Sequence, residues 1–353
     1  MSTTDVPSVK PPARDERLAQ TTAVTRLLRR PEFGALVGAV GVFVLFAIVD
    51  KTGQFASLNG LARWSDSAST IGIVAVAVAL LMIGGEFDLS AGVMVGTTGL
   101  FMGLLVTQAG MLVWPAILLT FLFAGAVGAM NGWLVVKTRL PSFIVTLATF
   151  FSLQGINLGV TKVITDTVRV AGIDEGIGFD SARAVFATDL WDPYKFRIAV
   201  VWWIVITIVA TWVLTRARFG NWITAVGGDA NAARNTGVPV ARTKIYLFMC
   251  TSMSAALVGI MTALRLRSVQ AGQGVGEEFT FIIAAVVGGC LLTGGFGSAI
   301  GASIGASIIG MAFIGIAFAG WNTDWSFLFL GVILFMAVMV NTIISRRASG
   351  GRR

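Results

Sequence analysis

The feature that most constrains this chain is a succession of long apolar runs separated by short polar segments. Hydrophobic residues make up 56% of the 353 residues and charged residues only 12%, whereas about 25% of the residues of an ordinary soluble domain are charged. A helix needs about 20 apolar residues to cross a bilayer. The pattern therefore predicts an all-α polytopic membrane protein, with about ten transmembrane helices near residues 33–49, 70–83, 90–108, 112–136, 141–160, 198–215, 245–264, 280–293, 297–319 and 326–344.

The distribution of basic residues predicts the orientation of the chain. An even number of spans puts both termini on one side, and cytosolic segments are enriched in Lys and Arg. If that side is the cytosol, the inner segments hold 17 of the 26 basic residues and the outer segments hold the other 9. We therefore expect both termini in the cytosol. The expected parts are a cytosolic tail (1–32), a transmembrane domain (33–345) with an extracytoplasmic loop (161–197) and a cytosolic loop (215–244), and a basic C-terminal tail (346–353).

The residue types that are missing exclude several kinds of chemistry. The chain has no histidine, which removes His-ligated metals, Ser-His-Asp and Cys-His nucleophile pairs, and His proton relays. We therefore expect no metal, no cofactor and no catalytic residue. The basic residues lie between apolar runs and at the ends, so the net charge of +8 reflects membrane topology. Nucleic acid is not an expected partner; the lipid bilayer is.

Two of the predicted helices are unusually short. The runs 70–83 and 280–293 have 14 residues each and stop at glycine pairs, Gly84-Gly85 and Gly294-Gly295. Paired short, glycine-interrupted segments point to a substrate path, because a broken helix offers free backbone groups to a ligand. Both runs are followed by a Gly/Ala-rich helix, which suggests a weak internal repeat. In the rival interpretation the glycines only allow close helix packing.

Acidic residues follow the first glycine pair, in the sequence GGEFDLS. Charges near apolar segments are costly and usually functional. Asp88 can serve as the N-cap of a helix that begins at Leu89, with Ser90 as the rival cap. Glu86 has no such structural role in the sequence pattern. It faces an aqueous path, pairs with a cytosolic Arg, or is solvated at the inner surface.

The cytosolic loop 215–244 contains a short helix in the sequence DANAARNTG. Asp229 can cap it, the alanines favour helix, and Gly237 ends it ahead of Pro239. Such a helix suits docking into a groove of another protein.

Four motifs resemble those of permease subunits of bacterial monosaccharide ABC importers of the ribose/xylose type. GGEFDLSAG is similar to their GG-x-DLS-x-G signature and GGDANAARNTGV to their cytosolic coupling segment. PSFIVTLATFFSLQGI and GGFGS match two further stretches, and all four occur in the family's order within about residues 33–345. Two positions differ: Glu86 replaces a common glycine, and Gln154 replaces a frequent basic residue.

The resemblance implies a subunit of the bacterial plasma membrane with the type II fold of cobalamin importers. It implies a homodimer or paired permease, a cytosolic ABC ATPase and an extracytoplasmic sugar-binding protein, and transport of a pentose or hexose by alternating access. No GxxxxGK[ST] occurs in the chain, in agreement with a separate ATPase. The residues expected at the substrate path or its gate are Gly84, Gly85, Glu86, Asp88, Ser90, Gln154, Asn157, Gly294, Gly295 and Ser298. Those expected to couple to the ATPase are Gly228, Asp229, Asn231, Ala232, Ala233, Arg234 and Gly237.

Two other functions remain open alternatives. A secondary carrier for a small polar solute would need no ATPase, but coupled carriers generally keep ionisable groups at mid-depth, and the predicted spans from residue 90 to 344 have none. An intramembrane enzyme would need a nucleophile and a base. Without histidine this means a Ser-Lys pair with a buried lysine, and no lysine falls inside a predicted span.

Overall fold

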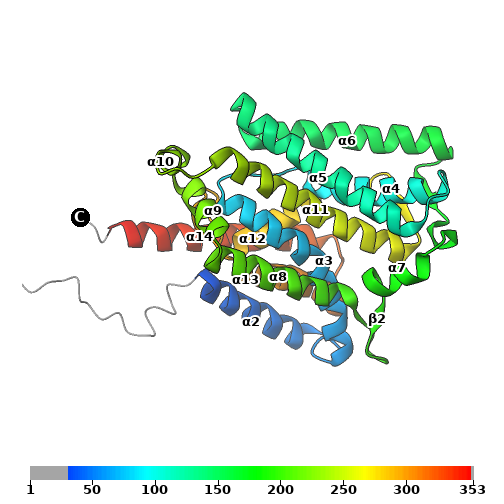
Figure 1. Cartoon of the computed structure of the whole chain (residues 1–353). Helices are drawn as coiled ribbons and strands as arrows, with labels where there is room; N and C mark the ends of the chain where they lie inside the picture. Colours follow the sequence, from blue (N-terminus) through cyan, green and yellow to red (C-terminus); the bar gives the residue numbers. More distant parts are fainter. Residues whose placement is uncertain (1–30, 351–353) are drawn as a thin grey trace, which may run out of the picture.

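A computed structural model describes residues 31–350 of the chain (Figure 1). The cytosolic tail predicted for residues 1–32 therefore falls almost entirely outside the described residues, as do residues 351–353. Each of the ten predicted apolar segments overlaps a helix, which supports an all-α polytopic membrane protein. These helices are α2 (Pro31–Val49), α3 (Leu58–Ile83), α4 (Ala91–Thr107), α5 (Val113–Thr138), α6 (Ser142–Thr165), α8 (Ile198–Arg216), α11 (Val240–Leu266), α12 (Glu277–Val287), α13 (Ala299–Phe318) and α14 (Trp325–Gly350).

Seven of the described helices are long and apolar enough to cross a membrane: α2, α3, α5, α6, α8, α11 and α13. Helix α4 and the Trp325–Met339 part of α14 are shorter apolar helices, and α12 has only 11 residues. The first and last described residues lie at the same end of the bundle as helices α9 (Arg218–Gly228) and α10 (Ala230–Asn235), as Figure 1 shows. Both helices belong to the segment predicted as the cytosolic loop.

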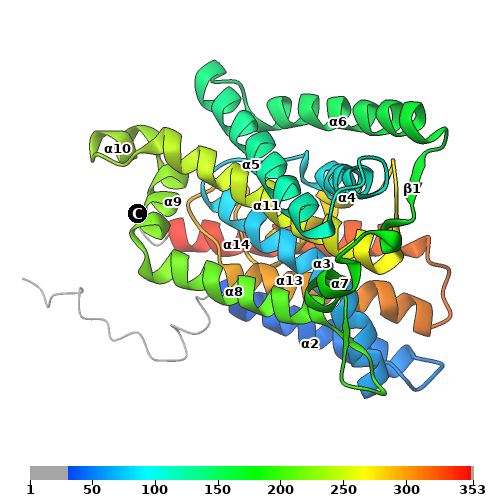
Figure 2. The same ribbon diagram turned by 45° about the vertical axis from the view of Figure 1, so that its right-hand side comes forward.

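Helices α3 and α11 form the centre of the bundle. Helix α3 packs against α13 and α8, and α11 packs against α5 and α4. Helix α6 lies at one edge and α2 at the opposite edge in both views (Figures 1 and 2). Most buried apolar side chains, among them Leu81, Met94 and Phe248, belong to one continuous core.

The prediction of a short helix at 70–83 is wrong. Helix α3 begins at Leu58, with the Ser57 side chain accepting a hydrogen bond from the Gly60 N–H, and has 26 residues, which is about 39 Å at 1.5 Å per residue. The apolar run begins late because the first turns carry polar residues that are paired within the protein: Arg265 donates to both carboxylate oxygens of Asp66, at 3.1 and 3.0 Å. This helix is therefore long enough to span.

The second short helix exists but has different limits. Helix α12 ends at Val287, before Gly288-Gly289, so the pair Gly294-Gly295 lies in the following loop. Ahead of it, strand β4 (Ser268–Gln270) pairs with β1 (Arg169–Ala171), and the chain then runs back along α4. A Cβ added at Gly92 would lie 2.1 Å from Oε2 of Glu278, so α12 begins beside the start of α4, inside the bundle.

Glu278, which lies between two of the predicted spans, is a buried acid of the domain. Glu278 is only 3% exposed, and one of its carboxylate oxygens accepts a hydrogen bond from the N–H of Gly276 at 3.0 Å. The sequence predicts residues 265–279 as a segment outside the membrane, between the spans 245–264 and 280–293, because it contains no apolar run; in the structure its end lies against α4.

The segment predicted as an extracytoplasmic loop, 161–197, is largely structured. Helix α6 continues to Thr165, and the remainder holds β1, the 3-10 helix η2 (Ile173–Glu175), α7 (Phe179–Phe186), and the antiparallel strands β2 (Asp189–Leu190) and β3 (Phe196–Arg197). This part lies at the end of the bundle opposite to α10 (Figure 1).

Candidate functional site

Three glycine pairs from distant parts of the sequence meet at one end of the bundle, and we call this contact the glycine junction. Two of the pairs are expected at the substrate path from the sequence, and the third ends α9 in the segment predicted as the cytosolic loop. The pairs are Gly84-Gly85 at the end of α3, Gly227-Gly228 at the end of α9, and Gly294-Gly295 between α12 and α13.

The backbones at the glycine junction lie too close for any side chain. A Cβ added at Gly227 would lie 1.7 Å from the carbonyl oxygen of Ile83. A Cβ at Gly294, whose φ is +80°, would lie 2.8 Å from the Cα of Gly85. The N–H of Gly295 donates to the Ile83 carbonyl oxygen at 2.8 Å. The three segments are therefore in direct backbone contact. Gly227 was missing from the residues expected at the site, because in the sequence it reads as an ordinary helix residue.

Glu86, next to the junction, forms an ion pair with Lys244 on the first turns of α11. Of the three interpretations left open for Glu86, the one that named a cytosolic Arg comes nearest, but the partner found is Lys244, at the end of the segment predicted as the cytosolic loop. Glu86 is 7% exposed, and the Lys244 side chain is 20% exposed. The chain thus does contain a partly buried lysine, but its ammonium group is paired with a carboxylate.

Asp88 stabilises the turn ahead of α4 rather than capping the helix. The helix begins at Ala91 and Ser90 is the residue at its N-cap position. Asp88 is fully buried, and its Oδ1 accepts both the N–H and the hydroxyl of Ser90, at 2.8 and 2.5 Å. Its Oδ2 has no hydrogen-bond partner among the described residues. The prediction of Asp88 as N-cap is therefore wrong. The rival residue, Ser90, occupies the N-cap position, although its side chain makes no capping hydrogen bond.

A row of polar side chains on α6 holds the non-helical segment 84–90. The Ser142 hydroxyl accepts the N–H of Phe87 and the Thr146 hydroxyl accepts the N–H of Leu89, each at 3.0 Å. Backbone groups within a membrane domain need such partners because lipid offers none. The spacing of Ser142 and Thr146, four residues apart in PSFIVT, is the sequence signal that could have identified them.

The polar row continues deeper into the bundle through Asn131 on α5. Asn131 donates to the Ser90 hydroxyl at 3.1 Å and accepts from the Thr149 hydroxyl at 2.6 Å. Further along α6, Asn157 donates to the Thr97 hydroxyl at 3.0 Å. The start of α4 is thereby fixed to α5 and α6.

Some of the expected path residues lie away from the glycine junction. Asn157 is buried against α4, and Gln154 is half-buried on α6, three turns or more from the start of that helix. Ser298 caps α13 by accepting the N–H of Gly301 at 3.2 Å. The residues predicted as one path are thus distributed along the depth of the domain.

The coupling segment forms the helix that its sequence predicts. Asp229 caps α10 by accepting the N–H groups of Asn231 and Ala232 at 2.8 and 3.0 Å, and Gly237 follows the helix with a φ of +87°. Ala233 is buried against Val226 and Val240. The side chains on the other face of α10 are exposed: Asn231, Ala232 and Arg234. Within residues 31–350, no cluster of three or more possible metal ligands occurs.

Comparison with known proteins identifies the family. The family described as "Branched-chain amino acid transport system / permease component" matches residues 60–338. The probable ABC transporter permease protein YphD of Escherichia coli K12 is 33% identical over 91% of this chain and 92% of its own length. The ribose import permease protein RbsC of the same organism is 31% identical over 86% of this chain and 92% of its own length. Its xylose transport system permease protein XylH is 28% identical over 89% of this chain and 92% of its own length. No solved structure matches the chain significantly.

These relatives agree with the resemblance seen in the four sequence motifs, and all three are transport components rather than enzymes. The chain therefore belongs to this family of ABC transporter permease subunits.

Proposed function

We propose that this chain is the membrane subunit of an ATP-driven importer that carries a monosaccharide by alternating access. A cytosolic ABC ATPase binds at α10, and an extracytoplasmic sugar-binding protein delivers the solute at the face formed by residues 166–197. Two permease subunits, identical copies in the simplest arrangement, assemble in the type II fold with ten spans each. Both termini lie in the cytosol of a bacterium.

The observation that carries this proposal is the glycine junction. Helix α10 exposes Asn231, Ala232 and Arg234 to a partner, and its buried Ala233 joins it to α9 and α11. Two residues before the Asp229 cap, at Gly227, the chain is in backbone contact with the end of α3 and with the loop before α13. A displacement of α10 by the ATPase is therefore passed to both segments with no flexible side chain between them.

The segments that would move are suited to act as a gate. Residues 84–90 form no helix and are held by hydrogen bonds to α6 and by the ion pair between Glu86 and Lys244. Two packing arrangements that differ in a few such contacts can be biased by a partner, which is the requirement for alternating access.

A neutral sugar fits the domain better than an ion does. The names of two relatives specify ribose and xylose. Three buried acids near the start of α4 and α12 are engaged within the protein: Glu86 by Lys244, and one carboxylate oxygen each of Asp88 and Glu278 by N–H or hydroxyl donors. Glu277, in the first turn of α12, is exposed. A secondary carrier would need one of these acids to bind the coupling ion.

Uptake by the complete transporter in proteoliposomes tests the proposal. Labelled ribose and xylose are compared with labelled leucine, because the family name also includes branched-chain amino acids. We expect accumulation of a sugar that requires ATP and the binding protein and persists when the proton and sodium gradients are collapsed. Uptake driven by an ion gradient without ATP would instead establish a secondary carrier.

A further inference from the structure

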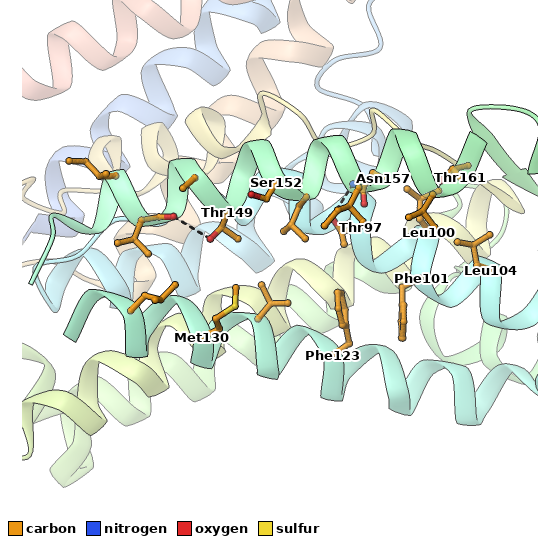
Figure 3. A pocket seen from close by; sticks show the side chains of 18 of the residues that line it. Thr97, Leu100, Phe101, Leu104, Phe123, Met130, Thr149, Ser152, Asn157 and Thr161 are labelled. Atoms are coloured by element: carbon orange, nitrogen blue, oxygen red, sulfur yellow. Dashed lines mark hydrogen bonds between the residues drawn. The ribbon is translucent and has the colours of Figure 1, made fainter. Parts of the chain in front are cut away.

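An elongated cavity of about 630 Å³ lies between α4, α5 and α6. Of the residues expected at the substrate path, only Asn157 lines it, and the glycine junction does not. Figure 3 shows Met130 of α5 across the space from Thr149 and Ser152 of α6. Further along the space, Phe123 of α5 lies beside Phe101 of α4, with ring centroids 4.6 Å apart. Its volume is within the range of ligand sites, about 300–1,000 Å³. The lining positions recur every three to four residues, from Phe123 to Thr138 on α5 and from Ile144 to Thr161 on α6. The cavity is therefore a groove parallel to the helices.

The chemistry of the groove favours a hydrocarbon chain over a sugar. Its wall is made mainly of Leu, Phe, Val, Ile and Met side chains. Among the polar lining residues, Thr97, Thr149 and Asn157 hydrogen-bond to one another's helices or to Asn131, and the Thr138 hydroxyl donates to the Leu134 carbonyl oxygen. Only the hydroxyl groups of Ser152 and Thr161 are left as polar groups of the lining without such a partner among the described residues. A sugar placed there would lose its bonds to water and find few replacements, which is costly for each hydroxyl group.

The groove also has the dimensions of a lipid chain. Along α6 it extends from Ile144 to Val160, which is about 24 Å at 1.5 Å per residue. One leaflet of the hydrocarbon core is about 15 Å thick, so a single acyl chain fits within the groove. Its rim is exposed and apolar, since Met130, Leu140 and Ile156 are 46%, 48% and 54% exposed. A chain can therefore enter sideways from the bilayer.

Basic residues at one end of the groove indicate which kind of lipid headgroup would bind there. The groove ends at Thr138 and Leu140, and the basic residues Lys137 and Arg139 stand beside them in the sequence. Both are exposed, and neither forms an ion pair with another described residue. Basic residues between transmembrane helices at the cytosolic side attract anionic lipid headgroups.

We infer that the groove between α5 and α6 binds one acyl chain of an anionic phospholipid whose phosphate contacts Lys137 and Arg139. This inference depends on the shape and charge of the groove, and it does not depend on which solute the transporter carries. The occupant that competes with lipid is a helix of a second copy of the chain.

Native mass spectrometry of the full chain tests the site, with phosphatidylglycerol as the anionic probe and phosphatidylcholine of the same chains as the neutral one. We expect the wild type to retain phosphatidylglycerol at least about tenfold more tightly, from two basic contacts near the membrane surface. The double variant Lys137→Gln/Arg139→Gln should lose this preference. Ala148→Trp, which fills the groove, should reduce binding of both lipids.

Matched controls separate the groove from the general surface. Arg216→Gln removes a basic residue at the end of α8, and Ile208→Trp enlarges a side chain that is 62% exposed on the same helix; both should bind lipid as the wild type does. Equal retention of the two lipids by the wild type, or unchanged retention by Ala148→Trp, would overturn the inference. So would a disulfide between two copies through Ala148→Cys, because it would place a second chain in the groove.

Discussion

At the scale of single residues, the glycines of the junction are needed because another backbone lies close to them, more than because they end helices. Gly227 and Gly228 are neighbours in sequence, yet a Cβ at Gly227 would overlap the Ile83 carbonyl whereas a Cβ at Gly228 would meet no atom within 4 Å. The requirement for glycine at the junction therefore comes from the approach of another backbone, and it differs between adjacent positions.

We predict that Gly227→Ala destabilises the protein and impairs transport, while Gly228→Ala does neither. Overpacking a close backbone contact costs about 1–3 kcal/mol, and the contact affected is the one that joins α9 to α3. Thermal unfolding of the purified chain and sugar uptake by the complete transporter are the two measurements. If the two variants had equal thermal stability and equal sugar uptake, the close contact between α9 and α3 would not be needed, and the glycine junction would not transmit movement of α10.

A second residue-scale prediction concerns the ion pair between Glu86 and Lys244. Glu86→Gln leaves a partly buried ammonium group without its carboxylate, which should cost about 1–3 kcal/mol, and Lys244→Gln should have a similar effect. The double variant should recover part of the loss, so a double-mutant cycle measures the coupling. Arg267→Gln breaks the more exposed pair with Asp174 and serves as the control, with an expected loss below about 1 kcal/mol. Strict additivity of the two single losses would contradict the assigned pair.

At the scale of elements, apolar patterning locates the helices but not all of their limits. The ten apolar runs overlap the ten helices, and the cap and the end of α10 follow from Asp229 and Gly237. The start of α3 was missed because Asp66 is accommodated by Arg265 from α11, a partner 199 positions away. Pairing over such distances leaves no local signal.

The candidate site was predictable to the same degree. Sequence motifs identified Gly84-Gly85, Gly294-Gly295 and the start of α10 as important. They could not show that Gly227 closes the contact, that Lys244 pairs with Glu86, or that Glu278 is buried beside α4. Each of these facts depends on how α9, α11 and α12 pack, and packing is a tertiary property.

The end of α10 provides a prediction at the element scale. Gly237→Val should uncouple transport from ATP hydrolysis, because a β-branched residue resists the φ of +87° found there. An added Cβ would meet no atom within 4 Å, so the effect is conformational rather than steric. Gly237→Asn is the matched control, since asparagine tolerates positive φ. We expect stimulation of the ATPase by loaded binding protein to fall in the valine variant and persist in the asparagine variant; the reverse, or no difference, would refute the role of this turn.

At the scale of the whole molecule, charge and architecture agree on which parts share a side of the membrane. The segments richest in basic residues include the loop with α9 and α10, and the two ends of the described chain lie at that same end of the bundle. Residues 166–197 occupy the opposite end. The positive-inside rule assigns the first end to the cytosol, so the ATPase and the binding protein would meet opposite faces.

Cysteine labelling in intact cells tests this orientation. The background carries Cys250→Ser and Cys290→Ser, because Cys250 is exposed in the chain. Asp180→Cys, on exposed α7, should react with a membrane-impermeant maleimide added from outside, whereas Arg234→Cys on α10 should react only after the membrane is permeabilised. Both positions are exposed in the folded chain, so a difference in reactivity reports the side of the membrane rather than burial. If the cytosolic and external reactivities were exchanged, the ATPase could not reach α10, and the coupling route through the glycine junction would be wrong as well.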